Sequence, residues 1–172
     1  MKDKNSKSIQ SYLLAVLGCI VLTVLDQLTK WLAVVHLKNQ EPFVIWKGVF
    51  KLEYLENRGA AFGIMQDRQI LFAVGAVVIV CLIGFIYGRM PHTSRFYLLR
   101  ICAVMICAGA IGNMIDRVRL NYVVDFFYFE LINFPIFNVA DCYVVVACIL
   151  FAFAILFYYK EDELSCFSLK KG

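Results

Sequence analysis

GAIGNMIDRVRLNYVVDFFYFELINFPIFNVADCY, residues Gly109–Tyr143, is the stretch around which this chain is organised. It carries three aspartates, Asp116, Asp125 and Asp141, beside or between two long apolar segments. An ionised carboxylate near hydrocarbon is costly, so an acid in such a place usually has a partner or a task. We therefore predict that the rest of the chain holds these acids at a membrane surface.

The composition indicates a membrane protein. Hydrophobic residues make up 62% of the 172 residues, whereas soluble domains contain roughly 45–50%. The length suits one compact unit, so we expect residues 1–172 to form a single membrane-embedded domain. The apolar run after the charged N-terminus is too long for the core of a cleavable signal peptide and lacks a small-residue cleavage site. The first helix is therefore expected to stay in the mature protein.

Four apolar segments are each long enough to span a membrane, which takes about 20 residues in a helix. Helices are expected because main-chain polar groups within lipid must be satisfied inside the segment. The predicted fold class is an all-α membrane protein with four transmembrane helices. Their expected bounds are about residues 12–35, 69–87, 96–115 and 135–159.

Four spans place both termini on the same side of the membrane. Lysines before the first span and after the last, with arginines around the joint 88–95, favour the cytoplasmic side by the positive-inside rule. The margin is narrow, because nine of the 17 Lys and Arg fall on that side. The polar tail from Lys160 is expected to be mobile.

A small β element is expected on the extracytoplasmic side. Apolar and charged residues alternate from Phe50 to Tyr54, a period of two that predicts a half-buried strand. The segment Tyr122–Phe129 is rich in β-branched and aromatic residues, which also favour extended structure.

Polar residues at the helix ends allow two interpretations each. Asp26 and Lys30 are four residues apart and share one helix face, so they form either an internal ion pair or a direct substrate contact. ENRGAAFG, at Glu56–Gly63, is either a turn or a site in which Asn57 and Arg58 donate to oxygen atoms. GAIGNMIDR places glycines, Asn113 and Asp116 on one helical face, which serves either close helix packing or a site.

Asp125 and Asp141 form the strongest candidate for chemistry. Two carboxylates that meet in a dry place cannot both ionise easily, so one stays protonated while the other is ionised. The ionised acid can then take a proton from water while the protonated acid polarises a scissile carbonyl, as in an aspartic protease. A helix N-cap role is the competing interpretation of Asp141.

Other functions have weaker support. The serines fall in the N-terminal segment, the cytoplasmic joint or the tail, away from the acids. His36 and His92 lie on opposite sides of the membrane, so a histidine zinc site does not assemble. A thiolate pair of Cys142 with His36 has nothing else to bring it together.

The seven cysteines lack paired spacing and argue against a disulfide framework. The net charge of +4 comes without a basic stripe, so no nucleic-acid partner is expected.

The motifs together resemble the bacterial lipoprotein signal peptidases, the type II signal peptidases. The matching segments run in order through most of the chain. They are DQLTK at 26–30, ENRGAAFG at 56–63, GAIGNMIDR at 109–117, VVDF at 123–126 and FNVAD at 137–141. One departure is visible, because Ala108 stands where the family often has a first glycine.

The resemblance implies an aspartic endopeptidase of the bacterial cytoplasmic membrane. Such enzymes remove signal peptides from prolipoproteins by cutting just before a cysteine that carries diacylglycerol. The resemblance also implies a membrane lipid environment, inhibition by globomycin, no metal and no cofactor. The catalytic pair would be Asp125 and Asp141 at the outer leaflet. The supporting residues would be Asp26, Lys30, Asn57, Arg58, Asn113, Arg117 and Asn138.

A non-enzymatic alternative remains at this point. The chain can also be read as a four-helix transporter subunit or assembly factor, in which the acids are packing or proton-relay groups. That interpretation predicts that replacing Asp125 or Asp141 leaves proteolysis unaffected.

Overall fold

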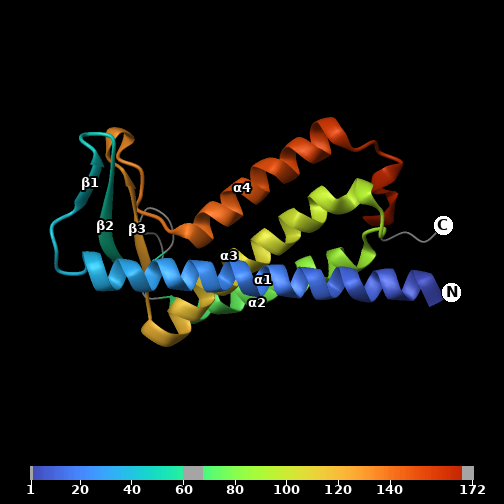
Figure 1. Cartoon of the computed structure of the whole chain (residues 1–172), viewed down its shortest axis with the longest axis horizontal. Coiled ribbons are helices and arrows are strands. Elements are labelled where there is room, and N and C mark those ends of the chain that lie inside the picture. Colours follow the sequence, from blue (N-terminus) through green and yellow to red (C-terminus); the bar gives the residue numbers. More distant parts are fainter. Residues whose placement is uncertain (1, 60–67, 168–172) are drawn as a thin grey trace.

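The computed structural model describes residues 2–59 and 68–167. Four long helices and one small sheet form most of this described part of the chain (Figure 1). The longer elements are α1 (Lys2–Leu37), β1 (Phe43–Trp46), β2 (Phe50–Asn57), α2 (Gln69–Arg89), α3 (Tyr97–Leu120), β3 (Val123–Phe129) and α4 (Val139–Phe153). The last helix continues as a π-helical turn, Ala154–Tyr158. Short 3-10 turns occupy Ser94–Phe96, Glu130–Ile132 and Glu163–Phe167.

All four helices are long and apolar enough to cross a membrane, which confirms the predicted fold class. Their outward surfaces are apolar: Leu14 is 68% exposed, Ile70 82% and Phe157 76%. Side chains of this kind would be unfavourable in water over so large an area, and they suit contact with lipid tails.

The helix bounds differ from those expected. The first helix starts well before residue 12, and the third continues to Leu120, five residues beyond the expected residue 115. The fourth begins at Val139 rather than at 135, because Asn138 adopts an extended conformation and caps the helix. The GNMIDR segment therefore lies inside α3.

α3 is the central helix of the bundle and packs against α1, α2 and α4. Its crossing with α4 is close: a Cβ added to Gly109 would lie 2.5 Å from the Ala140 carbonyl oxygen. Small residues let helices approach this closely in a membrane, where packing replaces the hydrophobic effect as the driving force.

The sheet lies at one end of the bundle, and the start of α1 lies at the other (Figure 1). Its strands are antiparallel in the order β1-β2-β3. The two predicted strands are confirmed as β2 and β3, whereas β1 was not predicted. Lys38, just after α1, pairs with Glu56 on β2 at 2.9 Å, and this hydrogen bond lowers the pKa of Glu56. The contact fixes the sheet against the end of α1.

The chain after α4 is packed rather than free at its beginning. Arg95 and Glu163 form an ion pair at 2.8 Å, and Tyr159 packs on Phe96 with ring centroids 5.3 Å apart. The tail that begins at Lys160 therefore contacts the α2–α3 joint through Glu163.

Candidate functional site

Asp125 sits on β3, where the sheet meets the start of α4. It is paired with Leu55 of β2, next to an irregularity in the register between Leu52 and Leu55. Such bulges redirect side chains. The carbonyl of Phe137 accepts hydrogen bonds from the two residues after Asp125. These bonds bring β3 against the segment that leads into α4.

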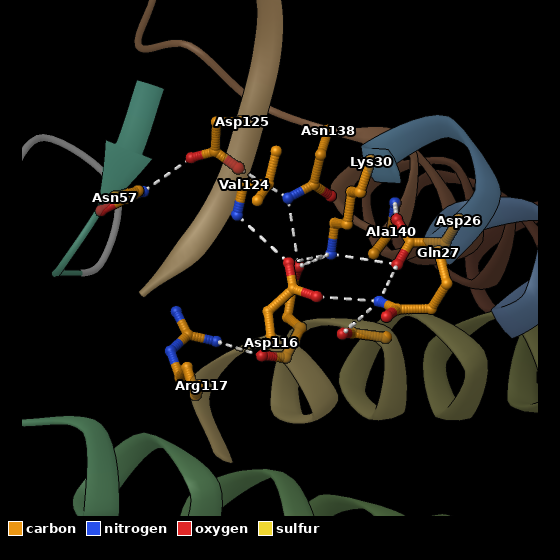
Figure 2. A network of polar contacts seen from close by, with 12 residues as sticks. Asp26, Gln27, Lys30, Asn57, Asp116, Arg117, Val124, Asp125, Asn138 and Ala140 are labelled. Carbon is orange, nitrogen blue, oxygen red and sulfur yellow. Dashed lines mark hydrogen bonds and ion pairs between the residues drawn. The ribbon is translucent and has the colours of Figure 1, made fainter. Parts of the chain in front are cut away.

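The Asp125 carboxylate is buried and held on both oxygens. The side chain is 1% exposed. Asn57 on β2 donates from Nδ2 to one oxygen at 2.8 Å, and Asn138 donates from Nδ2 to the other at 2.6 Å (Figure 2). Two amides from different elements therefore fix the orientation of this acid.

Asp141 occupies the first turn of α4. Its main-chain N–H donates to Asn138 Oδ1 at 3.0 Å, while Asp141 Oδ2 accepts from the Asn138 main-chain N–H at 3.1 Å. This reciprocal pair is a capping box. The N-cap role considered for Asp141 thus belongs to Asn138, and the second oxygen of Asp141 accepts from Asn113 Nδ2 at 2.8 Å.

Asn113 connects the acids to a buried lysine. Its Oδ1 accepts from Lys30 Nζ at 2.9 Å and from Asn138 Nδ2 at 3.1 Å. With its oxygen held by these two donors, the Asn113 amide must direct its Nδ2 group toward Asp141. Lys30 therefore orients the donor that holds Asp141.

Lys30 belongs to a second cluster of charges just behind the pair. Its Nζ lies 3.0 Å from Asp26 and 3.1 Å from Asp116 (Figure 2). The Lys30 side chain is only 3% exposed, and those of Asp26 and Asp116 are 0% and 4% exposed. The predicted internal ion pair of Asp26 with Lys30 is confirmed. Charges this deeply buried must be paired and hydrogen-bonded.

Each acid of this cluster also holds a main-chain group of another element. Asp26 on α1 accepts from the N–H of Ala140 on α4 at 2.9 Å. Asp116 on α3 accepts from the N–H of Val124 on β3 at 3.1 Å. The cluster thus fixes both residues that directly precede the candidate acids, because Ala140 precedes Asp141 and Val124 precedes Asp125.

Gly112 leaves the room that this cluster requires. A Cβ at this position would lie 2.5 Å from Asp26 Oδ2. Since that oxygen is already bound to Lys30, it has little freedom to move. The glycines of GAIGNMIDR therefore have both of the roles considered for them: they allow close helix packing, and they leave room for the charged side chains of the site.

Burial dominates the electrostatics of Asp125. Burial raises the pKa of Asp125 to about 7, and the nearby charge of Asp141 raises it as well. Hydrogen bonds from the two asparagine amides oppose this shift without cancelling it. Asp125 thus exists largely as a neutral acid below neutral pH, which is the behaviour expected of one member of a coupled pair.

The structure brings most of the predicted site residues into one network. Its members are Asp26, Lys30, Asn57, Asn113, Asp125, Asn138 and Asp141. Arg117 lies at its edge and donates to the carbonyls of Asn113 and Gly59, at 3.5 and 3.3 Å. Arg58 is separate: its side chain is 59% exposed and 4.0 Å from Glu56. The part of ENRGAAFG at 60–63 lies outside the described residues.

Gln27 is a member of the network that was not predicted from the sequence. Its Nε2 donates to Asp116 at 2.9 Å and to the Gly112 carbonyl at 3.2 Å. Gln27 follows Asp26 directly within DQLTK, and a polar amide inside an apolar span was an available signal. The main-chain N–H groups of Val124 and Ala140 could not be found from residue types.

Within residues 2–59 and 68–167, no group of three or more His, Cys, Asp or Glu side chains is placed to hold a metal ion. The acids of the site instead accept hydrogen bonds from amides and from Lys30.

Together these features define a multi-pass membrane protein with paired carboxylates in a buried polar network at one end of its helical bundle. Residues 18–157 match the family described as signal peptidase (SPase) II. The lipoprotein signal peptidase of Streptococcus pyogenes serotype M5 (strain Manfredo) is 40% identical over 152 residues, which cover 87% of this chain and 95% of that protein. The chain belongs to the signal peptidase II family, which cleaves signal peptides from prolipoproteins.

Solved structures agree with this membership. One bacterial membrane enzyme, solved by the in meso method at 2.3 Å resolution, superimposes with a TM-score of 0.73 at 25% identity and covers 92% of this chain and 93% of that one. A second, solved at 1.9 Å, gives a TM-score of 0.71 at 26% identity, over 84% of this chain and 94% of that one.

Proposed function

We propose that the chain is an aspartic endopeptidase in which Asp125 and Asp141 form the catalytic pair. The observation that carries this proposal is that one residue, Asn138, donates hydrogen bonds to both carboxylates. Asn138 donates from its side chain to Asp125 and from its main chain to Asp141. One residue thus orients both carboxylates, as a site that places one water between two acids requires.

The proposal assigns different charges to the two acids. Asp125 is buried on a strand and has a raised pKa of about 7, so we assign it the shared proton. Asp141 lies in the first turn of α4, where the helix dipole favours a negative charge. In this assignment Asp141 takes a proton from water while Asp125 donates a hydrogen bond to the scissile carbonyl. Water oxygen bonds to the carbonyl carbon, the C–N bond breaks, and the leaving amine takes the proton that Asp141 received from water.

The remaining predicted residues receive supporting roles in this proposal. Asn57, Asn113 and Asn138 hold the acids by hydrogen bonds. Asp26 and Lys30 act behind them through Asn113 and Ala140. To Arg117, at the edge of the network, and to the exposed Arg58 we assign contact with the peptide chain of the substrate.

The proposed substrate is a prolipoprotein whose cysteine already carries diacylglycerol, cut just before that cysteine. We propose that the whole chain acts as one membrane-embedded domain, with the lipid of the substrate remaining in the bilayer, and that globomycin-type compounds compete for the site. Membership of the signal peptidase II family supports this substrate class. Each buried CH₂ contributes ~0.8 kcal/mol to membrane anchoring, so lipidation concentrates the substrate at the site.

Cleavage of matched precursors tests the substrate. Purified protein should cut a diacylglyceryl-modified precursor much faster than the same precursor without lipid. A precursor in which serine replaces the lipid-bearing cysteine serves as the control. Equal turnover of all three substrates in the same detergent would contradict the lipid requirement.

We also propose that both termini face the cytoplasm and that the acids lie at the outer leaflet of the bacterial cytoplasmic membrane. The basic residues near the termini and in the joint between α2 and α3 support this orientation. Lys47→Cys in the exposed β1–β2 turn and Thr93→Cys in the opposite joint form a matched pair, on a background without native cysteines. An impermeant thiol reagent added to intact cells should label only Lys47→Cys. Labelling of Thr93→Cys alone would reverse the orientation.

A further inference from the structure

A cavity of about 730 Å³ lies at the end of the bundle opposite the acid pair. It opens between the start of α1 and the start of α3. The polar residues that line it are Gln10, Ser11, Tyr87, His92, Tyr97 and Arg100. None of these residues takes part in the network around Asp125 and Asp141, so the proposed function leaves the cavity unexplained.

Arg100 is the charged group of this cavity, and it is only 5% exposed. It donates to Ser11 Oγ at 2.9 Å and to the carbonyls of Met90 and Pro91 at 2.7 and 3.3 Å. Its guanidinium also lies 4.5 Å from the centre of the Tyr87 ring. All these partners are neutral, and the ion pairs of the described residues include none with Arg100. Buried cations within a membrane are held by opposite charges or by main-chain carbonyls, and among the described residues Arg100 has carbonyls but no acid.

Two residues that line the cavity also carry polar atoms without a hydrogen-bond partner among the described residues. Arg100 Nε is buried with no hydrogen-bond partner among the described residues. A guanidinium also has more N–H groups than its three hydrogen bonds use. Nδ1 of His92 is likewise buried and without a partner in the described part of the chain. Unpaired buried donors are costly, and an anion with several oxygen atoms would satisfy the unused N–H groups of the guanidinium.

The rest of the cavity wall is apolar and reaches toward the lipid. Leu14 on α1 and Ile101 on α3 line it and are 68% and 54% exposed on the outer surface of the bundle. Val104 continues the wall one turn further into the membrane. A molecule with a phosphate at one end and acyl chains at the other matches this lining, with the phosphate at Arg100 and a chain along α1 and α3.

We propose that this cavity binds the phosphate of an anionic phospholipid from the leaflet that faces the chain termini. Basic pockets between transmembrane helices are suited to lipid headgroups. A soluble anion would use the same arginine but would leave the apolar wall, which opens on the lipid side, without a partner. The bound lipid would join α1, α3 and the α2–α3 joint at the end of the bundle remote from the acids.

Lipid binding by the full-length protein in detergent tests this proposal. Native mass spectrometry would measure binding of dioleoyl-phosphatidylglycerol, of dioleoyl-phosphatidylcholine and of inorganic phosphate. We expect phosphatidylglycerol to bind at least ~10-fold more tightly than phosphatidylcholine, because the choline cation beside the phosphate of phosphatidylcholine is repelled by Arg100. Equal affinity for the two lipids would overturn the proposal. Competition by inorganic phosphate at equal concentration would assign the site to a soluble anion and overturn it too.

Two variants locate the binding. Arg100→Gln removes the charge, and Arg119→Gln, at the exposed far end of α3, is its matched control. Gly18→Leu fills the cavity, since a Cβ there points at Val104 at 3.4 Å, while Gly75→Leu on α2 has nothing within 4 Å. Both cavity variants should lose phosphatidylglycerol binding by ~10-fold or more, with both controls unchanged. If Arg100→Gln fails to fold, Gly18→Leu decides alone, and retained selective binding in it contradicts the site.

Discussion

Asn138 Nδ2 lies 2.6 Å from Asp125 Oδ1, and the same asparagine is the N-cap of α4. The start of the last membrane helix and the orientation of the buried acid are therefore set by one residue. Because the capping box includes Asp141, any shift in the start of α4 would also move the second acid.

Asn138→Ser should separate these two roles. A serine keeps the capping oxygen but removes the amide that donates to Asp125, so stability should change little while kcat falls at least ~10-fold. Asn138→Ala should lose both and cost about 1 kcal/mol more in stability. Thermal unfolding in detergent and turnover of lipidated precursor measure the two effects. Equal turnover by Asn138→Ser and the parent protein would contradict the positioning role.

The pH dependence should follow the proton on Asp125. Its raised pKa of about 7 means that it loses its proton as pH rises through that value, so kcat/KM should decline above about pH 7. The native state also retains a proton that the unfolded chain releases near 3.8, so stability should fall between about pH 4 and 7 and level off above. A kcat/KM profile that rises continuously to pH 9 would exclude this assignment.

Asn57→Ala should shift the decline of kcat/KM to higher pH. The hydrogen bond from Asn57 lowers the pKa of Asp125, and removing it leaves burial unopposed at one oxygen. Glu53→Gln on the same strand is the control and should not change the pH at which kcat/KM declines. The pH profiles of kcat/KM for both variants provide the measurement. A decline at lower pH in Asn57→Ala than in the parent protein would contradict the role of this hydrogen bond.

Sequence reasoning reached the parts of the site that depend on local spacing. Asp26 and Lys30 were placed on one helix face by their separation of four, and the structure pairs them at 3.0 Å. The motifs that carry Asn57, Asn113 and Asn138 also predicted members of one network. Spacing could not supply Asp116's partners on α1 and β3, since these depend on how the elements pack.

The start of the fourth span shows where pattern reading failed. Pro135 opens a hydrophobic run, and hydropathy alone does not separate the residues before a helix from the helix itself. The main chain of Phe137 pairs with β3, and Asn138 then caps the helix. β1 was missed for a related reason: its four residues are all exposed and show no alternation.

Gly112→Ala should destabilise the protein and reduce its activity. The added methyl would lie 2.5 Å from Asp26 Oδ2, an oxygen already held by Lys30. Overpacking of this kind costs about 1–3 kcal/mol. Gly75→Ala is the matched control, because nothing lies within 4 Å of its Cβ, and it should be neutral or up to ~1 kcal/mol stabilising. Similar melting temperatures for both variants would contradict this prediction, because they would mean that Asp26 moves aside for the methyl group at little cost.

Asp26→Asn should affect stability more than chemistry. Removing one partner of a buried ion pair costs about 3–5 kcal/mol, although Asp116 remains to hold Lys30. We therefore expect a lower melting temperature with measurable residual turnover at low temperature. Complete loss of activity in a protein with an unchanged melting temperature would instead place Asp26 in the chemistry.

The most direct test of the aspartic mechanism is turnover of lipidated precursor by purified Asp125→Asn and Asp141→Asn, with circular dichroism to establish folding. Each change keeps the shape of the side chain but removes the ability to share the proton, so kcat should fall ~10²–10⁴-fold in each. The double variant should be little worse than either single one, because the acids act as a unit. Substantial turnover by a well-folded Asp125→Asn or Asp141→Asn protein would contradict the account.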